Sequence, residues 1–226
     1  MARTADSRLA QQRSDLEAQE RAVAVRRTEL EAEELEEKFK GSARWREIVD
    51  TAADLFSRQG YDATSMQEIA DAVGMLKGSV YHYIRTKEDL LFQVLLEVHS
   101  VDYAAGIDAG LPSIERVRTY VQNHLRYNLT HLSRVSLYAI SINALSPARQ
   151  EVVIARRRRY DETLRSFIAD GKNDGTVRVN TDEKLTAIAM LTAMNSVHAW
   201  YDPSRGHNVE AITDAFTELF ITGLRS

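Results

Sequence analysis

The chain has 226 residues, of which 44% are apolar and 27% charged, and its formal net charge is −4 at pH 7. This length supports a sizeable core in one or two domains, and only 10 glycines and 3 prolines interrupt stretches rich in helix-favouring residues. Cysteine is absent, which excludes disulfide bonds, thiolate metal sites and a cysteine nucleophile. The acidic balance does not exclude nucleic acid, because phosphate binding depends on where the cations lie.

Residues 1–41 are mostly charged and carry one thin line of apolar side chains. Four of these recur every seven residues, which predicts a helix with a single apolar seam. They are Leu9, Leu16, Val23 and Leu30. The companion heptad positions are mainly Gln, Arg and Glu, so a pairing helix and a solvated arm are both open interpretations. The segment has no apolar block of the length that a secretory signal needs, so a cytoplasmic location is expected.

Residues 42–86 show the pattern of three short helices. Gly41 followed by Ser42 predicts the end of the arm and the N-cap of a new helix. That helix runs to about Gln59 with an apolar face at i, i+4, i+7 and i+8. The residues of this face are Ile48, Ala52, Leu55 and Phe56. A second helix is expected over Met66–Val73, and a third from Lys77 to about Tyr83.

The second and third helices have the signals of a helix-turn-helix. Ser65 and Glu68 form a capping box, in which each side chain satisfies a free backbone N–H at the start of the helix. Ala70 is small enough for a second helix to cross close to it, and Gly74 can adopt the left-handed conformation of a sharp turn. Helix, glycine-bearing turn and helix together predict a DNA-reading unit.

The third helix offers polar groups to a partner. Val80 and Ile84 lie four residues apart and are expected to anchor it inward. The residues expected on the outer surface can donate, accept or approach DNA closely. They are Lys77, Gly78, Ser79, Tyr81 and His82. Lys87 begins the next helix, where a cation and free N–H groups together can hold a phosphate.

The order and spacing of these pieces resemble the TetR family of one-component regulators. The matching runs are residues 63–70 (ATSMQEIA), 73–74, 77–83 (KGSVYHY) and 87–91 (KEDLL). The resemblance is strong over about 44–98 and absent from the first 40 residues. Two departures occur: Leu76 replaces a small polar cap, and Ile84 stands where phenylalanine is usual. The first leaves the start of the helix uncertain by about one residue, whereas the second alters only core packing.

The resemblance implies an all-α regulator in which the helix containing residues 78–83 enters the major groove. It implies a helix-turn-helix domain (42–86) and a ligand-binding and dimerisation domain (87–226), which follow the arm (1–41) that Gly41 and Ser42 set apart. Residues that match Thr64, Ser65, Tyr83 and Lys87 are expected to touch phosphates. The complete set expected at the DNA is Thr64, Ser65, Met66, Lys77, Gly78, Ser79, Tyr81, His82, Tyr83 and Lys87.

Beyond a helix from Lys87 to past Val98, prolines and a glycine-rich stretch at 171–175 divide the chain into about five further helices. Residues 187–200 are apolar nearly all round, and the last helix has an apolar face that includes Phe216 and Leu219. In the family such helices make a four-helix dimer interface, which would present two reading helices to a palindromic operator.

Four polar residues interrupt apolar runs in this half and are candidates for a ligand cavity, namely Tyr138, Asn143, Asn195 and His198. The alternative for each is a buried polar group bonded to nearby backbone. Arg156–Arg159 cannot converge, because successive helical residues point about 100° apart, so a solvated flank is favoured over contact with coenzyme A phosphates. The 199–203 segment (AWYDP) is similar to that of TetR-type regulators of fatty acid or steroid breakdown, so an acyl-CoA inducer is expected.

Other classes fit the sequence less well. Residues 185–201 lack charge but barely reach spanning length and contain several polar groups, so no membrane span is expected. The 6 histidines, at 82, 99, 124, 131, 198 and 207, lack zinc-binding spacing, and no cofactor motif or catalytic residue is found. An all-helical enzyme and a scaffold built on the arm are the alternatives to a regulator. A scaffold would predict that residues 1–40 assemble alone.

Overall fold

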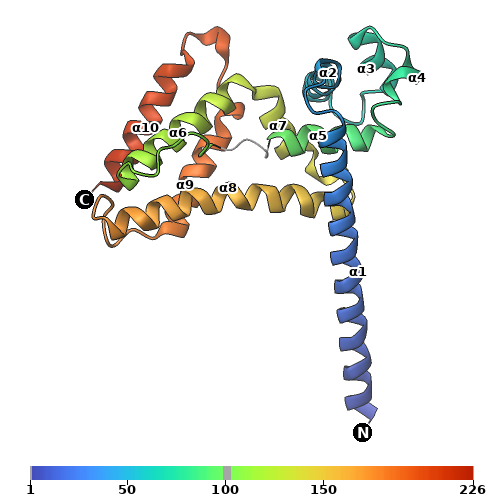
Figure 1. Ribbon diagram of the computed structural model, residues 1–226, viewed down its shortest axis with the longest axis horizontal. Helices are drawn as coiled ribbons and strands as arrows, with labels where there is room; N and C mark the ends of the chain where they lie inside the picture. Colours follow the sequence, from blue (N-terminus) through green and yellow to red (C-terminus); the bar gives the residue numbers. More distant parts are fainter. Residues whose placement is uncertain (1, 99–102, 226) are drawn as a thin grey trace.

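The computed structural model describes residues 2–98 and 103–225, without the side chains of 2–10 and 139. Within these ranges the elements are helices, and no strand occurs (Figure 1). The α-helices are α1 (Ala2–Lys38), α2 (Ala43–Gln59), α3 (Met66–Val73), α4 (Lys77–Val80), α5 (Lys87–Val98), α6 (Ser113–Thr130), α7 (Leu132–Ser141), α8 (Pro147–Asn173), α9 (Glu183–Asn195) and α10 (Val209–Leu224). Three short 3₁₀ turns cover Ile142–Ala144, Ser196–Ala199 and Pro203–Arg205. The predicted all-α fold is confirmed.

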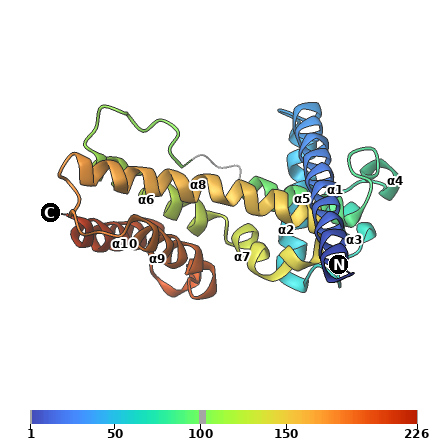
Figure 2. The ribbon, with the colours of Figure 1, turned by 90° about the horizontal axis from the view of Figure 1, so that it is seen from below.

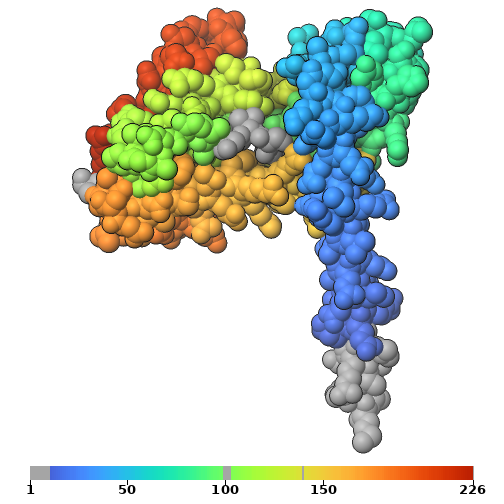
Figure 3. Space-filling model, in the orientation of Figure 1, coloured from blue at the N-terminus to red at the C-terminus, as the bar shows by residue number. Residues whose placement is uncertain are grey.

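The arm α1 is one continuous helix whose last third packs onto the body, while its earlier part projects (Figures 1 and 3). Ala32 is buried, and Phe39, just after the helix, stacks on Trp45 of α2 with ring centroids 5.0 Å apart. The solvated-arm interpretation is therefore wrong for this third. The predicted seam lies on the opposite side: Leu16, Val23 and Leu30 are 55%, 69% and 43% exposed. The side chain of Leu9 lies outside the described residues.

Helices α2, α3, α4 and α5 form the first core together with the second half of α7, the start of α8 and the end of α1. Ser42 accepts a hydrogen bond from the Trp45 N–H (3.2 Å) and begins α2 as predicted, and Gly60 ends that helix with a φ of 90°. Leu91, Val94, Leu95 and Val98 of α5 are all buried. Because α5 contributes to the first core, the boundary predicted between residues 86 and 87 does not separate the two cores.

The second core lies among α6, α8, α9 and α10, and the long helix α8 contributes to both cores (Figures 1 and 2). Helix α10 packs on α6, and α9 packs on α8. Helix α9 ends at Asn195, inside the uncharged 185–201 stretch. Across residues 2–98 and 103–225, no helix has both the length and the apolarity to cross a membrane.

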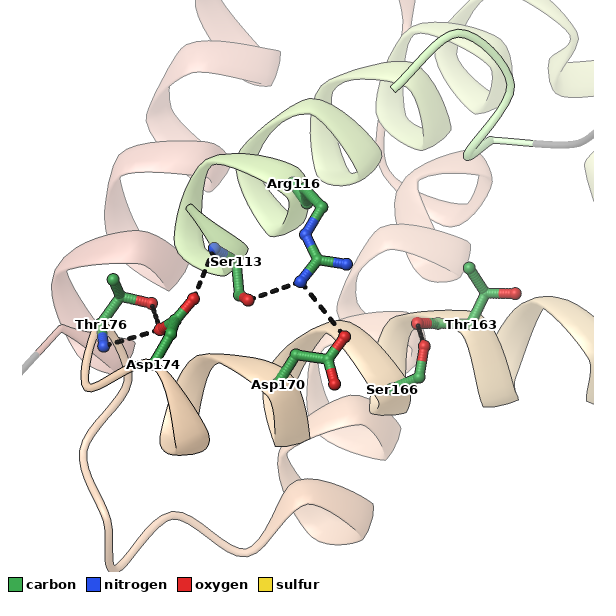
Figure 4. A network of polar contacts seen from close by, with 7 residues as sticks. All are labelled: Ser113, Arg116, Thr163, Ser166, Asp170, Asp174 and Thr176. Atoms are coloured by element: carbon green, nitrogen blue, oxygen red, sulfur yellow. Dashed lines mark hydrogen bonds and ion pairs between the residues drawn. The ribbon is translucent and has the colours of Figure 1, made fainter. Parts of the chain in front are cut away.

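Polar contacts tie the start of α6 to the end of α8 (Figure 4). The Ser113 N–H donates to Asp174 Oδ2 (2.9 Å), and the Thr176 N–H and hydroxyl donate to Asp174 Oδ1 (3.0 and 2.6 Å). Arg116 bridges the Ser113 hydroxyl and the Asp170 carboxylate at 2.6 and 3.1 Å. The hydrogen bonds from Ser113 and Thr176 hold the pKa of Asp174 well below its usual range.

Asp174→Asn therefore gives the first expected result. A carboxylate whose pKa is depressed in the folded state stabilises the protein above its unfolded pKa, about 3.9, and loses that contribution as the pH falls. We expect the variant to be less stable than the natural protein at pH 7 and the difference to shrink below about pH 4. Urea unfolding across this pH range measures the difference, and a constant gap would contradict the role of the charge.

Candidate DNA-binding surface and ligand cavity

The turn between α3 and α4 has the geometry that the sequence predicts. Ser65 Oγ accepts from the Glu68 N–H at 3.2 Å, and Glu68 Oε2 accepts from the Ser65 N–H at 2.7 Å, so the capping box is complete. The hydrogen bonds from Ser65 to the Glu68 carboxylate, that of the Ser65 N–H above all, lower the pKa of Glu68. Gly74 adopts the left-handed conformation (φ 70°, ψ 37°) and ends α3. Leu76 stands at the N-cap of α4 without a side-chain capping bond, and α4 itself is shorter than predicted because Tyr81–Tyr83 form a turn.

Helix α4 is anchored inward by Val80 and Ile84, which are both buried as predicted. The residues around this anchor are available to a partner. Lys77, Gly78, Tyr81 and His82 are exposed, and Ser79 is half-buried. Ser65, the N-cap of α3, is also exposed. These six residues remain the predicted DNA-contacting set.

Two of the predicted DNA contacts need correction because their side chains are buried. The Thr64 hydroxyl donates to the Gly60 carbonyl (2.8 Å) and accepts from Gln59 Nε2 (3.3 Å). Met66 packs into the first core. Neither side chain can reach DNA in this conformation, and Met66 offers only the first backbone N–H of α3, which has no intrahelical acceptor.

Lys87 also differs from the prediction. Its ammonium donates to the carbonyls of Tyr61 (2.9 Å), Asp62 (3.3 Å) and Thr64 (2.9 Å), and it lies 4.4 Å from the centroid of the Tyr61 ring. An ammonium has three protons, and all three are used here. Lys87 therefore ties the start of α5 to the loop before α3, and we correct its expected role from phosphate contact to support of the reading unit.

Lys87→Met keeps the length of the side chain and removes these hydrogen bonds. Because hydrogen bonds to a charged group contribute about 1.5–3 kcal/mol, we expect the free energy of unfolding to fall by about that amount. Lys77→Met is the control: its ammonium has no hydrogen bond or ion pair within residues 2–98 and 103–225. It should leave stability unchanged and reduce the salt dependence of DNA binding. A stable K87M variant with a reduced salt slope would restore the phosphate role.

The arm lies beside the reading unit, which the sequence did not predict. A groove of about 510 Å³ separates the end of α1 from the α4–α5 connection. Tyr81, His82 and Tyr83 line one side, and Glu34 and Leu35 of α1 line the other. Tyr83 is half-buried, with its ring centroid 5.1 Å from that of Phe39. The ring of Tyr83 thus packs on Phe39, which directly follows α1. The expected contact of Tyr83 with a phosphate stays a prediction.

A second hollow lies between the cores and has a volume of about 380 Å³. Its lining comes from α5, α6, α7, α8 and α9, from Tyr103 before α6 and from the segment after α9. The lining residues are Val98, Tyr103, Asn128, Val135, Tyr138, Arg157, Tyr160, Thr192, Asn195, Ser196 and His198. Three of the four predicted ligand residues are among them. Asn143 is not, because it is exposed in the 3₁₀ turn after α7, and its prediction is wrong.

Three polar side chains in and beside the cavity wall are hydrogen-bonded to one another. Asn195 Oδ1 lies 2.9 Å from His124 Nε2 and accepts from Asn128 Nδ2 at 3.2 Å. The amide oxygen can only accept, so His124 carries its proton on Nε2. His124 is buried and stacks on Tyr103 at 4.2 Å, and burial lowers its pKa to about 4. The wall of the cavity is therefore neutral here at physiological pH.

Helices α3 and α4, joined by the left-handed Gly74, form a helix-turn-helix with an exposed second helix. The helices that follow contain a cavity. These two features together define the class of helix-turn-helix regulators. Two family profiles match the chain. The profile for bacterial regulatory proteins of the tetR family matches residues 48–94, and the tetracyclin repressor-like C-terminal domain profile matches residues 110–224. The chain belongs to the TetR family of DNA-binding transcription regulators.

Individual relatives agree with this assignment. The HTH-type transcriptional repressor KstR2 of Rhodococcus jostii is 25% identical over 189 residues, which cover 82% of this chain and 93% of KstR2. The crystal structure of the TetR family regulator PfmR from Thermus thermophilus has a TM-score of 0.71 and 31% identity, covering 79% of this chain and 99% of PfmR. AibR in complex with isovaleryl coenzyme A and operator DNA has a TM-score of 0.69 and 26% identity, covering 78% and 97% of the two chains.

Proposed function

We propose that the protein is a transcriptional repressor of the cytoplasm that binds a palindromic operator as a homodimer and releases it when a small apolar or acyl-CoA-like inducer occupies the cavity. The observation that carries this proposal is the exposed α4 surface, in which Lys77, Gly78, Ser79, Tyr81 and His82 surround a buried anchor. Such groups suit contacts with phosphates and base edges in the major groove. KstR2 is named a repressor, which supports the direction of control.

The proposed homodimer is supported by exposed apolar side chains on the last two α-helices, α9 and α10. Leu185 and Ile188 of α9 are 64% and 50% exposed, and Leu219 of α10 is 68% exposed. Ala189 and Ala215 are exposed nearby in the sequence and are small enough for close helix packing. An apolar surface on both terminal helices suits a self-complementary interface around a twofold axis.

Two observations support the proposed inducer, namely the cavity and the ligand of a similar protein. The aromatic and apolar lining of the cavity, with a few polar groups, is typical of small-molecule sites, and its volume of about 380 Å³ lies within the usual range. AibR is described in complex with isovaleryl coenzyme A and operator DNA, which supports an acyl-CoA ligand here. Release of DNA requires that the ligand bind the DNA-incompetent state more tightly than the DNA-bound one.

The test uses an operator fragment selected from random duplex DNA and labelled with a fluorophore. The full-length protein should raise the fluorescence anisotropy of this fragment, and addition of acyl-CoA esters of increasing chain length should lower it again. Reversal by at least one ester with retained protein fold supports the proposed function. Binding that no ester reverses would contradict the acyl-CoA part of the proposal, and no DNA binding at all would contradict the whole.

A further inference from the structure

The four consecutive arginines of α8 have different surroundings. Arg156 Nη1 donates to Glu36 Oε1 of α1 at 2.7 Å, so this residue joins α8 to the arm. Arg158 and Arg159 are exposed. Arg157 alone of the four lines the cavity. The divergence expected from helical geometry therefore leaves one guanidinium at the cavity wall rather than a cluster.

Arg157 is held at the wall by Tyr138 of α7. Its Cζ lies 5.1 Å from the centroid of the Tyr138 ring, and its Nη1 donates to the Tyr138 hydroxyl at 3.2 Å. Side chain and ring are both half-buried. The aromatic face and the hydroxyl fix the orientation of the guanidinium, so fewer rotamers are lost when a ligand binds.

No acid balances this guanidinium at close range. Within the described part of the chain, no carboxylate oxygen lies within 4.0 Å of Arg157. Asp161, one turn further along α8, contributes only at longer range, and burial raises the pKa of its carboxyl group. The cavity lining contains no aspartate or glutamate. Because arginine keeps its charge in proteins, the cavity presents a fixed positive charge at Arg157.

A half-buried cation without a charged partner is best satisfied by an anion. The remaining lining favours an apolar body, since Val98, Val135 and the rings of Tyr103 and Tyr160 form much of it. We infer that the ligand of this cavity is an amphipathic anion whose carboxylate or phosphate group binds Arg157 and whose apolar part lies against these rings. This inference rests on the proposed function: it excludes neutral apolar inducers and assigns the negative charge of the ligand to Arg157.

The two sources of the negative charge make different demands on the cavity. A free carboxylic acid of moderate length fits with its charge at Arg157. In an acyl-coenzyme A the thioester is neutral, so the charge at Arg157 would be a phosphate of the nucleotide part, which lies far along the ligand from the acyl group. A volume of about 380 Å³ is at the lower end for ligand pockets, so part of such a thioester would lie outside.

Isothermal titration of the full-length protein, in the absence of DNA, distinguishes these ligands. The probes are octanoate, octanoyl-coenzyme A and the neutral octanamide. We expect at least one anionic probe to bind more tightly than octanamide, and Arg157→Gln to weaken that probe about tenfold or more without changing octanamide. Arg157→Lys, which keeps a charge but not the planar fork, should fall between. Arg158→Gln, one residue away and exposed, is the matched control and should bind like the natural protein.

Dependence of octanoate on Arg157 identifies a carboxylate ligand, whereas dependence of octanoyl-coenzyme A alone identifies a phosphate. Equal loss in R157Q and R158Q, octanamide binding as tight as the anions, or no binding of any probe would overturn the inference. A thermal melt of each variant separates loss of a ligand contact from loss of fold. Without ligand, R157Q should bind the operator as tightly as the natural protein does. A negative result for the ligand inference would therefore leave the proposal of operator binding intact, and the two can be tested separately.

Discussion

Leu219→Arg is expected to convert the protein into a monomer and to weaken operator binding by about 100-fold or more. Leu219 is 68% exposed on α10, and a charge there would be desolvated in an interface between two copies. A dimer binds the second half-site at a high effective concentration, which contributes about 10²–10⁴ in avidity, and a monomer loses this gain. Sedimentation velocity measures the oligomeric state, and anisotropy titration of an operator fragment measures the affinity.

Val179→Arg provides the matched control. Val179 is 81% exposed in the segment between α8 and α9, outside both terminal helices, so the same change is made without touching the proposed interface. This variant should remain dimeric and bind DNA normally. A dimeric L219R protein would contradict the assignment of the interface, and a monomer with undiminished affinity would contradict the need for two copies on one operator.

Gly78→Leu is expected to abolish most specific DNA binding while leaving the fold intact. Apart from the neighbouring residues and the backbone of α4 itself, no atom lies within 4 Å of the position that a Cβ would occupy at Gly78. Its φ is not positive, so a Cβ can be added there without a clash. Leucine also has a higher helix propensity than glycine by about 0.8 kcal/mol, so stability should not fall. The added carbons would instead occupy the space through which α4 approaches DNA.

We expect a loss of about 10–100-fold in operator affinity for G78L, corresponding to one or two lost contacts of about 1–3 kcal/mol. Gly78→Ala, with a single added carbon, should lose less. The control is Ala105→Leu, which adds bulk at an exposed position remote in sequence from the helix-turn-helix. Anisotropy titration and urea unfolding of the three variants check both halves of the prediction, and operator binding by G78L equal to that of A105L would contradict the placement of α4 in the groove.

The reading unit was predictable because its signals are local. The capping box of Ser65 and Glu68, the left-handed Gly74 and the inward pair Val80 and Ile84 each act within a few residues, and the structure has all of them. Local pattern could not predict that Tyr81–Tyr83 leave the helix. A helix of one turn gains little from its own hydrogen bonds, so contacts from elsewhere in the fold set its end.

The role of Lys87 could not be predicted because its hydrogen-bond partners are distant in the sequence. Lys87 donates to carbonyls 23 to 26 residues earlier, and such pairs leave no periodic signal. Thr64 and Met66 lie on either side of the N-cap Ser65, and the side chains of both are buried. Lys87 and Thr64 are residue types compatible with contact to phosphate, and the tertiary fold gives their side chains other partners.

The cavity was partly predictable. Three of the polar residues selected within apolar runs, Tyr138, Asn195 and His198, line the cavity, and their contact with a ligand stays a prediction. The same reasoning selected Asn143, which a 3₁₀ turn exposes. Arg157 was hidden within a run of four arginines, and only its packing against Tyr138 separates it from its neighbours. In the arm, the conspicuous seven-residue repeat predicted the wrong contact face, because those of its side chains that the structure describes are exposed. Ala32 and Phe39, which are not part of the repeat, attach the arm to the first core.

The central claim is that two copies of the short helix α4 are presented together to base edges of one duplex. Selection of bound fragments from random duplex DNA at modest ionic strength, with the full-length protein, tests it most directly. We predict enrichment of an inverted repeat whose half-site centres lie about 34–36 Å apart or a multiple of that distance. Recovery of fragments with no shared inverted repeat would contradict it.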